Sequence, residues 1–326
     1  MTTHSHIERQ IFIGGCGRSG TTLLGAMLGA HSDCICAPES HFKMRALRPG
    51  DWTSDSVDLM AAFKRIRRHW RFKIWELDLP PSEVPVEELD GSYPRLLEWM
   101  ATRFADHVGK PDARIWVDHT PENIIYAPTL LKLFPQAKII HIVRDGRGVA
   151  SSIMPLDWGP STIVAAARWW LDNVTYGLAL ETLMEADRIV RVKYEDLVSD
   201  PLETLGELSA SLGIDFQPGM IEANGFTPPR YTVNQHKLIG KKPDARRATR
   251  WETRLTPRQI EIFESMAHDF LHYLGYPLRY GLAARGPTLG DRGVQGIREF
   301  GRDWVVNPVR WLRRSYRLWL GGSSAQ

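Results

Sequence analysis

The sequence predicts an α/β fold: a P-loop-like three-layer sandwich with a mostly parallel central sheet and helices on both of its faces. Three observations lead to this prediction. Short apolar, β-rich runs alternate with helical patterns over residues 10–278, as they do in βαβ units. A glycine-rich turn, GGCGRSG, directly follows the first apolar run. The chain of 326 residues, 43% hydrophobic and 24% charged, has the composition of a globular protein.

Local sequence patterns predict the individual strands, helices and turns. Strands are expected at the short apolar runs 10–14, 34–37, 114–117, 138–143 and 189–194. Apolar residues at helical spacing predict helices from residue 21 onward and at 56–72, 92–108, 162–186, 201–212 and 257–274. A further helix ends before Pro135, and Gly213 and Gly275 end the helices that precede them. Residues 144–147 are expected to form a turn, followed by a short helix that begins near residue 149.

The chain is expected to consist of a main domain, residues 1–278, and a basic, Trp-rich appendage, residues 279–326. Residues 43–113 are interpreted as an insertion between the first βα unit and the next strand. A net charge of +3 argues against general binding of nucleic acid. Three clustered cysteines do not suggest a disulfide framework or a zinc site. With a polar N-terminus and no apolar run of about 20 residues, a cytoplasmic location is expected.

The glycine-rich turn resembles a Walker loop, G-x-x-x-x-G-K-[ST], with one difference. Gly15 and Gly20 have the required spacing and Thr22 occupies the Ser/Thr position, but Thr21 stands where the lysine belongs. Backbone N–H groups at a helix N-terminus, together with the side chains of Arg18 and Ser19, still make an anion site. The residues expected to bind the anion are Gly17, Arg18, Ser19, Gly20, Thr21 and Thr22. Without the lysine, the Mg²⁺-dependent chemistry of a kinase or NTPase is disfavoured.

The segment GGCGRSGTTLL resembles the 5′-phosphosulfate loop of sulfotransferases that use 3′-phosphoadenosine 5′-phosphosulfate (PAPS). The R-S-G-T-T form is similar to the tyrosylprotein branch and to bacterial members of that family. The resemblance extends to IHIVRDGRGVASSI, where Arg144 and Ser152 match the family's arginine and serine that bind the 3′-phosphate. A planar guanidinium suits phosphate oxygens, and Ser152 is expected early in the next helix, near the positive end of its dipole.

The resemblance also implies which groups react. In APESHF, Glu39 aligns with the family's general base, which takes the proton of the acceptor hydroxyl. In VDHTPEN, His119 occupies the position of a lysine that stabilises the leaving oxygen, so His119 is either that donor or a second candidate base. Arg18 is expected to contribute charge beside the transferred group. At position 41, where the tyrosylprotein branch has an arginine, this sequence has His41.

Two basic segments are expected to contact the substrates. Residues 63–75, FKRIRRHWRFKIW, combine basic and aromatic side chains and are interpreted as part of the acceptor side or as a solvated helix face. Residues 240–255 contain the R-W pair of many bacterial sulfotransferases, in which Arg250 is expected to bind the donor. The C-terminal sequence WVVNPVRWLRRSYRLWL either docks on the protein, pairs subunits or contacts a membrane surface.

The sequence thus favours a sulfotransferase that uses PAPS as donor, releases PAP and needs no metal. The acceptor would be a hydroxyl-bearing carbohydrate, lipid, peptide or small natural product, and no nucleic-acid partner is expected. Two alternatives remain: a P-loop nucleotide kinase or NTPase, and a non-catalytic nucleotide-binding protein with a membrane-associating tail.

Overall fold

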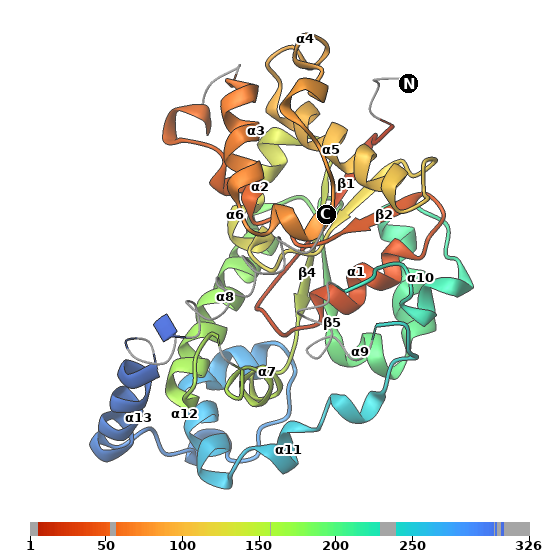
Figure 1. Cartoon of the computed structure of the whole chain (residues 1–326). Helices are drawn as coiled ribbons and strands as arrows, with labels where there is room; N and C mark the ends of the chain where they lie inside the picture. Colours follow the sequence, from red (N-terminus) through yellow and green to blue (C-terminus); the bar gives the residue numbers. More distant parts are fainter. Residues whose placement is uncertain are drawn as a thin grey trace. The chain divides into compact units, whose positions relative to one another are not determined.

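The computed structural model describes residues 6–52, 57–156, 158–228, 239–302, 304, 308 and 309. It divides into two compact units (Figure 1). Unit 1 comprises Met1–Val143 and Thr175–Ala245, and unit 2 comprises Arg144–Val174 and Arg246–Gln326. The predicted boundary at residue 278 stays a prediction.

Unit 1 is built on a parallel sheet of five strands within the described residues. These are β1 (Arg9–Gly14), β2 (Cys34–Ala37), β3 (Ile115–Asp118), β4 (Lys138–Val143) and β5 (Ile189–Lys193). Their order is β2-β3-β1-β4-β5, and each neighbouring pair is parallel. The carboxyl ends of all five strands therefore lie at one edge, and the strand order reverses around the central β1. Ligands of such sheets bind at this kind of switch point.

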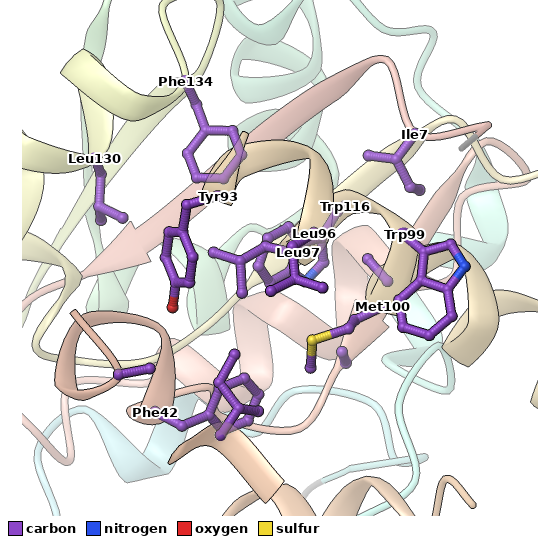
Figure 2. Packing of buried hydrophobic residues seen from close by; sticks show 14 of the residues in the cluster. Ile7, Phe42, Tyr93, Leu96, Leu97, Trp99, Met100, Trp116, Leu130 and Phe134 are labelled. Carbon is purple, nitrogen blue, oxygen red and sulfur yellow. The ribbon is translucent and has the colours of Figure 1, made fainter. Parts of the chain in front are cut away.

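Helices cover both faces of the sheet. On one face, Phe12 and Trp116 pack against α5 (Tyr93–His107) and α6 (Asn123–Leu133). Figure 2 shows Leu96, Leu97 and Met100 of α5 in this cluster. On the other face lies α1 (Thr21–Gly29), whose last residue is so close to β2 that a Cβ on Gly29 would lie 2.6 Å from Cβ of Cys36. The predicted three-layer α/β fold is confirmed.

The remaining elements of unit 1 are short. After β5 come α9 (Tyr194–Ser199), α10 (Pro201–Leu212) and η4 (Pro218–Glu222). Before β3 come α2 (Phe42–Arg45), η1 (Pro49–Trp52), α3 (Leu59–Arg68), η2 (Phe72–Trp75), η3 (Pro81–Glu83) and α4 (Val86–Leu89). Tyr194, expected as the last residue of a strand, begins α9 instead.

The helix predicted at 56–72 is too long at its C-terminal end. The chain leaves α3 at His69, whose backbone is extended, and His69 Nδ1 accepts a hydrogen bond from the Arg71 amide at 3.2 Å. This side-chain turn ends the helix, after which Phe72 and Trp75 enter the core in a separate 3₁₀ turn. Residue 56 lies outside the described residues.

Unit 2 is helical. It contains α7 (Gly146–Ile153), the first part of α8 (Ile163–Leu183), α11 (Trp251–Arg254), α12 (Pro257–Tyr273), η7 (Gly281–Ala283) and α13 (Leu289–Gly301), while η6 (Ala245–Arg247) joins the units. The helix predicted to begin near residue 149 begins at Gly146, so the turn predicted at 144–147 is wrong for its second half. The Asp145 side chain caps this helix. Among the described residues, none of the helices has the length and apolar character needed to cross a bilayer.

Candidate active site

The loop after β1 has the strained backbone expected of a close ligand contact. Gly15 and Gly20 have positive φ angles of 152° and 103°, and Arg18, which is not a glycine, has φ 70°. A Cβ on Gly15 would lie 2.3 Å from the carbonyl oxygen of Ile142 in β4. The loop is therefore fitted tightly between the ends of β1 and β4, in a conformation that favours glycine at positions 15 and 20.

The loop leads directly into α1 and leaves polar groups for a ligand. The N-cap residue is Gly20, which provides no side-chain cap, so the first-turn amides lack an intrahelical acceptor. Thr21 and Thr22 are buried in this turn. Ser19 is fully buried, and its hydroxyl has no hydrogen-bond partner among the described residues. These donors suit a phosphate or sulfate group.

Glu39 lies after β2 in a cluster of charges. Its Oε2 accepts hydrogen bonds from Arg71 and, at 3.1 Å, from His41 Nε2. The other nitrogen of His41, Nδ1, lies 3.0 Å from Oε2 of Glu122. Burial alone would raise the pKa of Glu39, but the hydrogen bond from His41 and the charge of Arg71 lower it to about 2. Glu39 is thus a partly buried carboxylate that is held ionised.

His119 follows β3 and is buried beside the same cluster. Its Nδ1 lies 3.4 Å from the Cys36 thiol, and its ring packs edge-on against Phe226 at 4.8 Å. Burial lowers the pKa of His119, although the charge of Glu39 acts in the opposite direction. Burial also raises the pKa of Cys36, so this sulfur remains a thiol. A thiol that donates to Nδ1 would leave the ring proton on Nε2, where a neutral imidazole can donate it.

A buried polar network, not anticipated from the sequence, supports both groups. Lys43 Nζ lies 3.1 Å from Asp118 Oδ2 and 2.7 Å from Asn123 Oδ1, and both charged side chains are 1% exposed. Asn123 Nδ2 donates to the carbonyl of Ile13 in β1 at 3.1 Å. The hydroxyl of Ser40 donates to Asp118. The network therefore fixes the ends of β1 and β3 and the segment that carries Glu39. No local signal marks Lys43, because a lysine is ordinarily exposed.

In unit 2, Arg144 lies in a group of arginines. Its Nη2 donates to the carbonyl of Arg247 at 3.3 Å, and its own carbonyl accepts from Trp170 Nε1 at 3.1 Å. Burial lowers the pKa of Arg254, and the charges of Arg250, Arg247 and Arg144 lower it further. Four guanidinium groups thus share one positive field, which favours an anion. The sequence motifs point to Arg144 and Arg250, with Arg247 as a weaker match, whereas Arg254 joins them only through the fold.

Ser152 does not lie near the positive end of a helix dipole, so this prediction is wrong. Because α7 begins at Gly146, Ser152 is the seventh of its eight residues and lies in the last turn, away from the positive end. Its assignment to a phosphate rests on the family resemblance alone.

Arg147 of α7 connects the R-W pair to the rest of unit 2. Its guanidinium is fully buried and bonds Asp145 Oδ2 at 2.7 Å and Glu264 Oε1 at 2.5 Å. The same guanidinium lies 4.0 Å from the centre of the Trp251 ring. Trp251 is therefore anchored, and with it the neighbouring Arg250. No cluster of three or more His, Cys, Asp or Glu side chains suited to a metal occurs in the part of the chain that the structure describes.

Comparison with known proteins supplies the family. The model of the sulfotransferase family matches residues 10–218. Protein-tyrosine sulfotransferase 1 of Danio rerio is 31% identical over 294 residues, covering 83% of this chain and 74% of that protein. A protein-tyrosine sulfotransferase of Drosophila melanogaster is 27% identical over 228 residues, but these are 66% of this chain and only 40% of the fly protein.

A solved structure shows the same fold. The sulfotransferase domain of the Synechococcus PCC 7002 olefin synthase is similar with a TM-score of 0.56 and 23% identity, over 84% of this chain and 97% of that domain. The family model covers more than half of the sequence and spans the loop after β1, Glu39, His119 and Arg144. This chain is an enzyme of the sulfotransferase family.

Proposed function

We propose that the protein transfers a sulfuryl group from PAPS to a hydroxyl group of an acceptor. The observation that carries this proposal is the family match over residues 10–218, a range that includes both phosphate motifs and both candidate reacting groups. The loop after β1 supports it physically, because its donors suit an anion while Thr21 replaces the lysine that a Walker loop places on the γ-phosphate.

Each phosphate-bearing end of PAPS has its own set of candidate residues in this chain. The 5′-phosphosulfate suits the loop of unit 1, where Ser19 has a buried hydroxyl without a partner among the described residues and Arg18 adds charge. The 3′-phosphate suits the arginines of unit 2, in which Arg144, Arg250 and Arg247 share one field. Ser152 is assigned to the same phosphate by the family pattern. No metal enters this proposal.

The chemistry is an in-line displacement at sulfur. The acceptor oxygen forms a bond to sulfur while the bond from sulfur to the phosphate oxygen breaks, and PAP leaves. The acceptor's proton passes to the carboxylate of Glu39, which is held ionised and ready to accept it. His119, neutral because it is buried, would donate its Nε2 proton as a hydrogen bond to the leaving oxygen.

The acceptor is proposed only as a hydroxyl compound: a carbohydrate, a lipid, a peptide or a small natural product. Arg71 brings the segment 63–75 into direct contact with Glu39, which supports an acceptor-side role for this segment in the proposed reaction. Trp70 is exposed beside it, and the Arg71 guanidinium lies 4.4 Å from the Trp70 ring. An aromatic surface next to the base suits a ring or sugar face.

Ligand binding tests the donor. Thermal unfolding is measured with PAP, ADP and ATP, each with and without Mg²⁺. Stabilisation by PAP that does not depend on Mg²⁺ would support the proposal, while stabilisation by ATP only with Mg²⁺ would support a nucleotide kinase or NTPase instead.

Substitution tests the chemistry. Glu39→Gln should retain PAP binding and lose transfer by about 100-fold or more, the usual scale for removal of a general base. Glu87→Gln, an exposed glutamate of α4, is the matched control and should leave both unchanged. Binding of PAP by the wild-type protein without transfer to any hydroxyl acceptor would favour the non-catalytic alternative.

A further inference from the structure

Helix α13, Leu289–Gly301, is part of unit 2 and is drawn in dark blue in Figure 1. Its polar side contacts the rest of this unit. Asp291 Oδ2 accepts a hydrogen bond from Arg258 Nη2 at 2.8 Å. Glu299 Oε1 accepts from the Ser161 amide at 2.7 Å. Just past the helix, the buried Arg302 donates to the carbonyl of Leu156 at 2.6 Å. These three charged side chains therefore face the protein.

Apolar side chains of the same helix, and that of Trp304 just after it, are exposed. Leu289, Ile297, Phe300 and Trp304 are 87%, 75%, 64% and 73% exposed. Leu289, Ile297 and Phe300 are separated by eight and three residues, a spacing that places them on one stripe of the helix. The rings of Phe300 and Trp304 stack at 5.9 Å. An amphipathic helix normally buries its apolar stripe, and contiguous exposed patches of this kind mark sites of interaction.

The charges around the stripe indicate what covers it. Arg292 and Arg298 are exposed, and on a helical projection they lie on opposite sides of the stripe. From residue 302 to the C-terminus, the sequence has five arginines, three tryptophans and a single acidic residue. Basic residues that flank an aromatic and aliphatic stripe suit an anionic lipid surface, where the stripe enters the interface and the arginines meet the headgroups.

We propose that α13 binds the surface of an anionic membrane, with its Leu289, Ile297 and Phe300 and the following Trp304 inserted among the lipids. The helix would lie parallel to the surface, held to the protein by Asp291 and Glu299. This proposal is independent of the sulfuryl transfer, so lipid binding can fail while the proposed activity holds, and the reverse.

Sedimentation of the full chain with vesicles tests it. Vesicles of phosphatidylcholine are compared with vesicles that also contain phosphatidylserine. The wild-type protein should bind the mixed vesicles, and Ile297→Ser/Phe300→Ser/Trp304→Ser should bind them at least about 10-fold more weakly, since the apolar stripe is removed. In Arg292→Gln/Arg298→Gln, the affinity for the anionic vesicles should fall about 5-fold for each arginine removed, while binding to the neutral vesicles should not change.

The control is Leu183→Ser/Leu202→Ser, which removes two exposed leucines of unit 1 and should not change vesicle binding. Equal binding by the wild-type protein and the triple variant would overturn the proposal. So would a wild-type dimer that the triple variant converts to a monomer without any vesicle binding, because a second copy would then be the occupant. Binding only after removal of residues 305–326 would make the chain's own C-terminus the occupant.

Discussion

Arg71 and Glu39 form an ion pair although 32 positions separate them in the sequence. His41, which stands where the tyrosylprotein branch has an arginine, binds the same carboxylate oxygen. The cation beside the candidate base therefore comes from the segment 63–75, and this ion pair connects the predicted insertion to the candidate base.

Arg71→Met should change the pH dependence of transfer. The pKa of Glu39 is lowered to about 2, in part by Arg71, so loss of this cation lets burial raise the pKa. A base must be ionised, and the acid limb of kcat/KM should therefore move to higher pH by about 1 to 3 units. Arg67→Met, an exposed arginine of α3, should leave the limb in place. An unmoved limb in Arg71→Met would argue against Glu39 as the base.

Ser19→Ala should make the folded protein more stable while weakening its binding of PAP. Its buried hydroxyl has no partner in the described residues, so its removal should raise the free energy of unfolding by about 1 kcal/mol. The affinity for PAP, measured by calorimetry, should fall about 10-fold or more, since a hydrogen bond to a charged phosphate is lost. Ser209→Ala removes another buried hydroxyl that has no partner among those residues, in α10, and should raise stability without changing affinity. Equal PAP affinity in both variants would remove Ser19 from the donor site.

Gly15→Ala should unfold at a lower urea concentration and fail to bind PAP. Its φ of 152° is unfavourable for alanine, and the new Cβ would lie 2.3 Å from the carbonyl oxygen of Ile142. A Cβ on Gly206 of α10 would meet no atom of the surrounding described residues within 4 Å, so Gly206→Ala should instead raise the free energy of unfolding by about 0.5 to 1 kcal/mol. Normal PAP binding by Gly15→Ala would contradict the close fit of the loop.

Lys43→Met should lower the free energy of unfolding by about 3 to 5 kcal/mol, because it leaves the carboxylate of Asp118 buried without its cation. The double variant Lys43→Met/Asp118→Asn should recover part of this loss in urea titrations. If the double variant changed the free energy of unfolding by the sum of the two single changes, the two side chains would not interact.

The ion pair of Lys43 and Asp118 should also make the stability of the protein depend on pH. Burial would raise the pKa of Asp118, but the charge of Lys43 and the hydrogen bonds from Ser40 and Thr120 hold it well below its usual range. The folded state therefore binds this proton more weakly than the unfolded chain does. The contribution of Asp118 to stability should be complete above about pH 4 and decline as the pH falls below it.

The strands could be predicted because each is a short apolar run, and the glycine-rich loop after β1 because its glycines and hydroxyls lie close together in the sequence. The contacts made by the candidate base and by the buried lysine could not be predicted. Arg71 contacts Glu39 only in the folded chain. The buried ammonium group of Lys43 is stabilised by hydrogen bonds to Asp118 and Asn123. Neither contact is marked by a local pattern in the sequence.

The early start of α7 escapes prediction for a related reason. Its first residue is a glycine, which ordinarily disfavours a helix. Here a Cβ on Gly146 would lie 2.4 Å from the ring of Phe263 and 2.6 Å from that of Trp170, so close packing against α8 and α12 requires the glycine. Tertiary packing overrides the local preference.

The chain passes from one compact unit to the other three times: after Val143, inside α8 and after Ala245. Neither unit is a continuous stretch of the gene. A fragment that ends at Val143 therefore lacks β5, and a fragment that begins at Arg144 carries residues 175–245 of unit 1 without the other four strands described. A truncation meant to isolate either set of phosphate-binding candidates consequently divides the sheet of unit 1, so both sets have to be studied in the full chain.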